Sequence, residues 1–62
     1  MAGRYELLKM ARDQRAMAAR ARRLAQGLLL EADHQRLLQY AIGLDDEARL
    51  LECQAAALRL DS

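Results

Sequence analysis

Leucine and alanine alternate between residues 37 and 58, at intervals of four and three residues that place them on one face of an α-helix. Such a repeat is typical of a helix that packs along another helix, as in a coiled coil. We call these residues the Leu/Ala stripe: Leu37, Ala41, Leu44, Ala48, Leu51, Ala55 and Leu58. The stripe predicts a helix over about residues 31–60.

A run with the same intervals lies in the N-terminal part of the chain and predicts a helix over about residues 4–27. Its members are Leu7, Met10, Gln14, Met17, Ala21, Leu24 and Leu28. When Leu7 takes heptad position a, the two methionines and Leu24 take position d, so we expect them to face the second helix. The flanking e position holds short side chains that let a neighbouring helix approach closely: Ala11, Ala18 and Ala25.

Gln14 is the polar member of this run and has two interpretations. Its amide is either a partly exposed group near an end of the bundle, or a device that selects register and partner, as in some coiled coils. Gly27 lies directly before Leu28, the last member of the run, and the phase of the apolar positions shifts after Leu28. We therefore predict a turn at about residues 27–32, with Gly27 ending the first helix at a positive φ and Asp33 as a candidate N-cap.

Gly43 and the acidic residues after it resemble a helix end followed by a new helix start, which would give three helices. The Leu/Ala stripe nevertheless passes Gly43 without a change of phase. Because a turn normally resets this phase, we favour one long helix, in which the glycine costs about 1 kcal/mol relative to alanine.

The second helix has more apolar surface than one partner helix covers. Leu38 and Ile42 widen its apolar face, and a further set recurs at intervals of three, four and three. We call this set the second stripe: Leu50, Cys53, Ala57 and Leu60. A hairpin has only one inside, so we expect the second stripe to contact another chain. The predicted fold is all-α, an antiparallel helical hairpin that associates into a four-helix bundle through the two stripes.

The composition supports this fold. The 62 residues include no proline and many Ala, Leu, Arg and Glu residues, which favour helices. We expect a single domain over residues 1–62, and domains this small usually need disulfides, a metal or oligomerisation. With Cys53 as the one cysteine and His34 as the one histidine, neither an intrachain disulfide nor a four-ligand zinc site can form. Oligomerisation is the remaining route to stability.

Charge is unevenly distributed, although the net charge is only +1. Residues 1–27 hold seven Lys and Arg against two carboxylates, whereas residues 28–62 hold three Arg against seven carboxylates. One face of the first helix is basic: Lys9, Arg12, Arg15, Arg22 and Arg23. This face is either a candidate nucleic-acid surface that contacts phosphates, or a solvated face that neutralises the acidic half. We favour the second interpretation, because the face has no stacking aromatic residue and the chain is not strongly basic.

The sequence contains no catalytic or cofactor-binding motif. It has no nucleophile with an adjacent base and no Gly-rich phosphate loop, and the carboxylates of Asp45, Asp46 and Glu47 diverge around a helix. We expect no enzyme, no cofactor and no metal. The longest apolar run, residues 28–30, is far shorter than the roughly 20 residues that span a membrane, and the N-terminus does not follow a signal-peptide pattern. We expect a cytoplasmic protein without a membrane partner.

Residues 24–27 (Leu-Ala-Gln-Gly) and 37–41 (Leu-Leu-Gln-Tyr-Ala), preceded by Tyr5 and an Arg/Ala-rich helix, resemble a group of short alpha-proteobacterial proteins. In that group an Arg/Ala/Leu helix, a short turn and an LLxxA helix recur. Its members usually start the second helix with Asp-Pro, where this chain has Leu30 and Glu31. The group has no assigned activity, so the resemblance implies a helical hairpin alone.

The small residues and leucines from Ala41 to Ala55 also resemble those of Rop, an RNA-binding antiparallel dimer that forms a four-helix bundle. The turn segment, residues 30–35, is similar to Rop as well. The RNA face of Rop is a polar and basic strip with an aromatic residue, which the basic face of this chain lacks. The resemblance therefore implies the bundle architecture and not RNA binding.

These observations predict a non-enzymatic protein-interaction module that forms a homodimer through its apolar stripes. Two alternatives stay open. One is a Rop-like nucleic-acid-binding protein that uses the basic face, and the other is a small subunit that packs on another helical protein in a larger complex.

Overall fold

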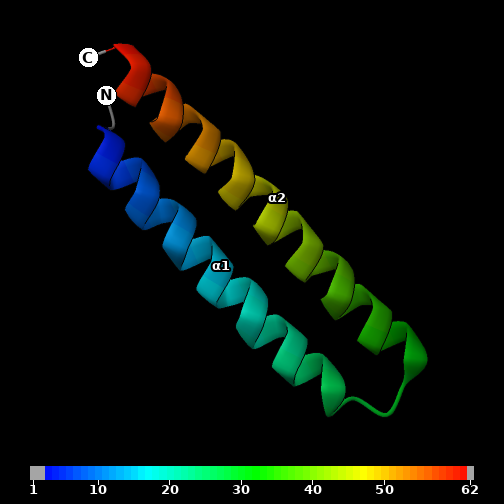
Figure 1. Ribbon diagram of the computed structural model, residues 1–62. Coiled ribbons are helices and arrows are strands. Elements are labelled where there is room, and N and C mark those ends of the chain that lie inside the picture. Colours follow the sequence, from blue (N-terminus) through cyan, green and yellow to red (C-terminus); the bar gives the residue numbers. More distant parts are fainter. Residues whose placement is uncertain (1–2, 62) are drawn as a thin grey trace.

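Two antiparallel α-helices, joined by a short loop, make up the structure (Figure 1). The computed structural model describes residues 3–61, and side chains over residues 3–58. Helix α1 spans Arg4–Gln26 and helix α2 spans Glu31–Asp61. The helices lie side by side in a hairpin of 50 × 15 × 13 Å, with the start of α1 and the end of α2 at the same end (Figure 1). The predicted helical hairpin is confirmed, with helix bounds within one residue of those expected.

Helix α2 runs through Gly43 without a break, so the prediction of one long helix is confirmed. A Cβ atom added at Gly43 would meet nothing within 4 Å, so close packing does not require glycine at this position. The acidic residues that follow Gly43 stay helical and do not begin a new element. The continuous phase of the Leu/Ala stripe outweighs the local glycine signal, because its members from Leu37 to Ala55 are all buried or half-buried.

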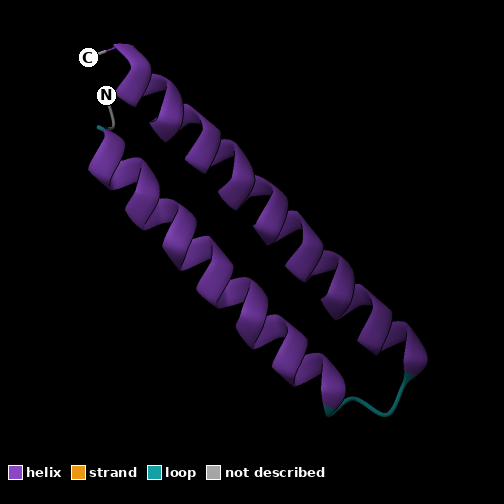
Figure 2. Cartoon of the chain, in the orientation of Figure 1, coloured by secondary structure: helices purple, strands orange, loops and turns teal. Residues whose placement is uncertain are grey.

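The loop occupies residues 27–30 (Figure 2). Gly27 caps α1 with φ −89° and ψ −3°, and no described residue has a positive φ, so the expected positive φ at Gly27 is wrong. The reason is that the chain continues its right-handed turn: the N–H of Gly27 donates to the Leu24 carbonyl at 3.1 Å, and the N–H of Leu28 donates to the Ala25 carbonyl at 3.2 Å. These bonds satisfy carbonyls at the end of α1.

Helix α2 begins at Glu31, and the His34 N–H donates to the Leu30 carbonyl at 3.0 Å to close its first turn. Asp33 therefore lies inside the first turn, so its candidate role as N-cap is wrong. Its carboxylate lies 3.7 Å from the guanidinium of Arg36 on the same helix. Glu31 and Asp33 still place negative charge at the N-terminus of α2, where the helix dipole favours it.

The core between the helices is built largely from alanine. The Leu/Ala stripe faces α1 as expected: its three alanines and Leu44 are buried, Leu37 and Leu51 are half-buried, and Leu58 is more exposed. The buried positions of α1 are Leu7, Ala11, Ala18, Ala21 and Ala25. Seven of the nine buried hydrophobic residues in the described chain are thus alanines.

Met10, Met17 and Leu24 do not face α2 as expected, because they are 47%, 47% and 57% exposed. Positions a and e of α1 make the contact instead of positions a and d. Alanine at position e ends at Cβ, so the two backbones approach closely along this line. The longer side chains at position d are left on one side of the contact, where they border a groove between the helices.

Candidate interaction surface

One side of the hairpin is apolar and uncovered, and we call it the open face. On α1 it consists of Met10, Met17 and Leu24, which recur every seven residues and so share one side of the helix. On α2 it consists of residues that line the same hollows: Leu37, Tyr40 and Leu50. Tyr40 is 51% exposed and Leu50 64% exposed. Large apolar side chains that stay half-exposed together form an apolar patch, so this side of the hairpin is a candidate interaction surface.

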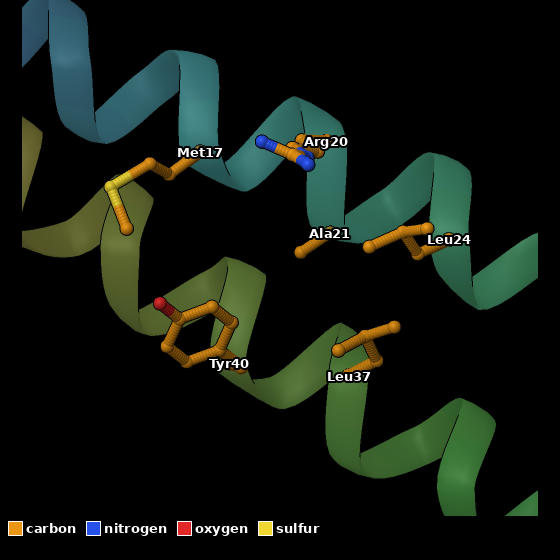
Figure 3. A pocket seen from close by; sticks show the side chains of 6 residues that line it. All are labelled: Met17, Arg20, Ala21, Leu24, Leu37 and Tyr40. Carbon is orange, nitrogen blue, oxygen red and sulfur yellow. The ribbon is translucent and has the colours of Figure 1, made fainter.

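Two shallow hollows follow each other along the open face. Figure 3 shows the hollow nearer the loop, with Met17 and Leu24 of α1 opposite Leu37 and Tyr40 of α2. Ala21 lies between these side chains, and Arg20 also lines this hollow. The hollow nearer the chain ends is lined by Met10, Gln14, Glu47, Leu50, Leu51 and Gln54. The open face is therefore a groove between two helices, with side chains that project at regular intervals.

The polar residues that line these hollows include Gln14, Arg20 and Glu47, each of which has a polar group without a partner among the described residues. The side-chain oxygen Oε1 of Gln14 is buried and accepts no hydrogen bond there. Neither Arg20 nor Glu47 forms an ion pair within the part of the chain that the structure describes. A buried oxygen without a donor costs free energy, so a group that supplies a donor to Gln14 would be favoured here.

A different side of the α1/α2 contact is polar, and we call it the ion-paired face. Arg15 donates from Nε and Nη2 to both carboxylate oxygens of Glu52, at 2.8 and 2.7 Å. Asp45 lies 3.6 Å from Arg15 and also pairs with Arg22. Two positive charges on α1 thus face two negative charges on α2. The hydrogen bonds from Arg15 lower the pKa of Glu52 and, in turn, raise the pKa of Arg15.

The five residues of the basic face of α1 fall into two groups, those that pair with carboxylates of α2 and those that do not. All five basic residues are exposed, as expected, but Arg15 and Arg22 are directed to carboxylates of α2. Lys9, Arg12 and Arg23 are thereby left as the part of that face without such contacts among the described residues. Within the hairpin, Arg15 and Arg22 thus neutralise two carboxylates of the acidic half, Asp45 and Glu52.

The second stripe lies away from α1. Leu50, Cys53 and Ala57 are exposed, while the side chain of Leu60 lies outside the described residues. Of the residues expected to widen this surface, Ile42 is 47% exposed and Leu38 is half-buried. Leu50 borders both the second stripe and the open face. The uncovered apolar surface therefore extends over α2 and, unexpectedly, over the methionines of α1.

The open face could be found from the sequence only by comparing residue sizes at two heptad positions. The intervals of three and four fit both the a/d and the a/e choice, because Leu7, Gln14 and Ala21 belong to either. The decisive signal is alanine at the three e positions after Leu7, each directly after a longer side chain at position d. Arg20, Tyr40 and Glu47 gave no sequence signal, since the hollows they line form between two helices.

His34 contributes to the loop end of the hairpin. Its Nδ1 lies 2.8 Å from the carbonyl oxygen of Ala25, and since a carbonyl only accepts, Nδ1 carries the proton. Within the described residues, no group of three His, Cys, Asp or Glu side chains could hold a metal ion. The helices, over the same residues, also include no segment with the length and apolar character to cross a membrane.

Comparison of the chain with protein-family models, curated proteins and solved structures finds no match.

Proposed function

We propose that this chain is a non-enzymatic protein-interaction module that self-associates through its open face into a dimeric four-helix bundle. The observation that carries the proposal is the position of Met10, Met17 and Leu24, which leave half of their surface in water beside the exposed Tyr40 and Leu50. Burial of such side chains is worth about 0.8 kcal/mol for each CH₂ group. A second layer of helices over this face would bury these side chains.

The thinness of the core supports the same conclusion. No large side chain of the described residues is completely buried, and alanine contributes little apolar area to the contact between α1 and α2. A single core in a chain of this size rarely supplies more than about 3–5 kcal/mol. Burial of the open face would therefore add apolar contact that the core between α1 and α2 does not supply.

Analytical ultracentrifugation of the full chain over a dilution series tests the proposal. We expect a species of twice the 7.0 kDa monomer mass that dissociates on dilution. The double variant Met17→Gln/Leu24→Gln should weaken the dimer, because it places amides on the open face. Leu29→Gln is the matched control, since Leu29 lies in the loop and is 99% exposed.

Two outcomes would overturn the proposal. A folded monomer at every concentration would indicate a subunit that packs on a different protein. A dimer that survives Met17→Gln/Leu24→Gln but dissociates after Cys53→Glu/Ala57→Glu would place the interface on the second stripe.

Nucleic-acid binding has less support, because two of the five basic residues already pair with carboxylates of α2. Titration with duplex RNA at low salt checks this alternative. Affinity that falls steeply with added salt, and is lost in Lys9→Gln/Arg12→Gln/Arg23→Gln, would favour it over self-association.

A further inference from the structure

We infer that the open face is covered by a second copy of this chain that lies antiparallel to the first, related by a twofold axis that passes Met17. This inference rests on the proposed function and specifies the orientation of the two copies. Three features of the open face are symmetric about the same point: the spacing of its apolar residues on α1, their spacing on α2, and the positions of its unpaired polar groups.

The apolar residues of α1 are symmetric about Met17. Met10 and Leu24 each lie seven residues from it, and all three are about half-exposed. A twofold axis at Met17 therefore places Met10 opposite Leu24 of the second copy, and Met17 opposite its own equivalent. A twofold interface uses the same patch on both copies, so a patch with this internal symmetry is suited to it.

The apolar residues of α2 are symmetric about the same level of the hairpin. Ala18, next to Met17, packs in one cluster with Leu44, so the middle of the open face on α2 lies near residues 44–45. Tyr40 and Leu50 lie five residues on either side of residue 45. The same axis thus brings Tyr40 opposite Leu50 of the second copy, which covers two exposed apolar side chains at once.

The unpaired polar groups complement one another across this axis. Gln14 and Arg20 each lie three residues from Met17, so Arg20 of one copy comes opposite Gln14 of the other. Arginine has only hydrogen-bond donors, and the buried Oε1 of Gln14 lacks one. Glu47 lines the same hollow as Gln14 and lacks a cationic partner among the described residues. Arg20 of the second copy would supply both a donor and a positive charge, and the contact occurs twice.

A parallel arrangement of the two copies does not provide these contacts. There, equivalent residues lie at the same level, so Arg20 comes level with Arg20 and Glu47 with Glu47 of the other copy. Arg20 then lies six residues, about 9 Å along a helix, from the level of Gln14 in the other copy, whereas the antiparallel arrangement brings these two groups to the same level. Gln14 would also remain without a donor from Arg20.

A second copy that covers the whole broad side of the hairpin, which extends beyond the open face at both ends, would bury an area close to that of a stable dimer. A long face of the hairpin measures 50 × 15 Å, or about 750 Å². A standard stable interface buries about 800 Å² on each partner. The ion-paired face, already neutralised by Arg15 and Arg22, lies on another side of the α1/α2 contact and does not need to be covered.

Disulfide cross-linking between two variants tests the orientation. Met10→Cys and Leu24→Cys are made separately in the full chain, each together with Cys53→Ser. The two proteins are mixed until their subunits have exchanged, and the mixture is then oxidised. The antiparallel arrangement predicts covalent heterodimers of Met10→Cys with Leu24→Cys in large excess over homodimers of Met10→Cys. In a parallel arrangement the same two positions would lie about 21 Å apart, fourteen residues along a helix, and would not react.

Ala16→Cys is the matched control, because Ala16 is exposed on α1 and does not line either hollow of the open face. It should form no cross-link with itself or with Leu24→Cys. A dimeric mass without the Met10–Leu24 cross-link would overturn the orientation and leave the proposed function standing. A monomeric mass for the unmodified chain would overturn both.

Charge reversal provides a second, independent test. Arg20→Glu and Glu47→Arg should each raise the dimer dissociation constant by about tenfold or more, since each affects two symmetric contacts. The double variant Arg20→Glu/Glu47→Arg should recover most of the affinity. Failure of the double variant to recover it, with helicity retained, would count against the antiparallel pairing.

Discussion

The Nδ1 atom of His34 lies 2.8 Å from the carbonyl oxygen of Ala25, so the first turn of α2 is hydrogen-bonded to the last turn of α1. Ala25 also accepts the N–H of Leu28 through the same oxygen. The helices are thus joined by a side chain as well as by the loop. A donor at the C-terminal end of a helix satisfies a carbonyl that has no partner within the helix.

Loss of this donor should destabilise the hairpin. We expect His34→Ala to lower the free energy of unfolding by about 0.5–1.5 kcal/mol, the usual range for one hydrogen bond. Urea unfolding followed by circular dichroism measures the change at a fixed protein concentration. Gln35→Ala is the control, because the exposed side chain of Gln35 bonds to Glu31 on the same helix and to no residue of α1 that the structure describes, so its effect should be smaller. Equal effects of the two variants would contradict a capping role for His34.

The Arg15–Glu52 pair should make the free energy of unfolding decrease at acidic pH. Hydrogen bonds from Arg15 lower the pKa of Glu52 below its ordinary value of 4.5. As the pH falls, the Glu52 carboxylate is therefore protonated in the unfolded chain before it is protonated in the folded one. The pair therefore contributes its full stability above about pH 4.5, and this contribution is lost as the pH falls through the lower pKa of the folded state. Between pH 7 and pH 3, the urea midpoint of Glu52→Gln should fall less than that of the unmodified chain.

Asp46→Asn is the matched control for this experiment. Asp46 pairs with Arg49 on the same helix and does not join α1 to α2. The variant should keep the acid dependence that Glu52 produces. If Glu52→Gln and the unmodified chain lose stability equally as the pH falls, protonation of Glu52 is not coupled to unfolding.

The alanine core should not tolerate larger residues. Ala48 is fully buried against α1, so Ala48→Leu would force the backbones apart and cost about 1–3 kcal/mol. Ala16→Leu introduces the same side chain on an exposed turn of α1 and should be nearly neutral. Both variants replace alanine with leucine and so change helix propensity by the same amount. A difference between their urea midpoints therefore reports the difference in packing. Similar stability for the two variants would contradict the close a/e packing.

Gly43 offers the opposite change, a gain in stability. It lies within α2, and a Cβ atom at this position meets no other atom within 4 Å. Gly43→Ala should therefore stabilise the fold by about 0.5–1 kcal/mol, because the glycine loses more backbone entropy on folding. An unchanged or lower thermal midpoint would indicate that the glycine serves a contact outside the single chain.

The sequence was sufficient for the helices and for one side of their contact. Every turn of the Leu/Ala stripe from Leu37 to Leu58 carries the period of the helix, and this redundancy outweighs the single glycine at residue 43. The bounds at Gln26 and Glu31 follow from the loss of phase around Gly27. These features are local, so neighbouring residues are enough to determine them.

The choice between positions d and e of α1 could not be made in this way. Periodicity places Met10 and Ala11 on adjacent sides of one helix, and only the distance between the two helices decides which is buried. That distance depends on alanines of both helices, such as Ala18 and Ala41, which are far apart in the sequence. The same limit applies to Gln14, whose missing donor is visible only once α2 is in place.

The alanine core has an evolutionary consequence. Because most buried positions of the hairpin hold the smallest side chain that has a Cβ atom, the contact between α1 and α2 constrains those positions separately from the residues of the open face. Exchange of Met10, Met17, Leu24 or Tyr40 for other side chains would alter the recognition surface without changing how α1 meets α2. Under the proposed function, such exchanges would change which surfaces the hairpin binds while the backbone stays the same.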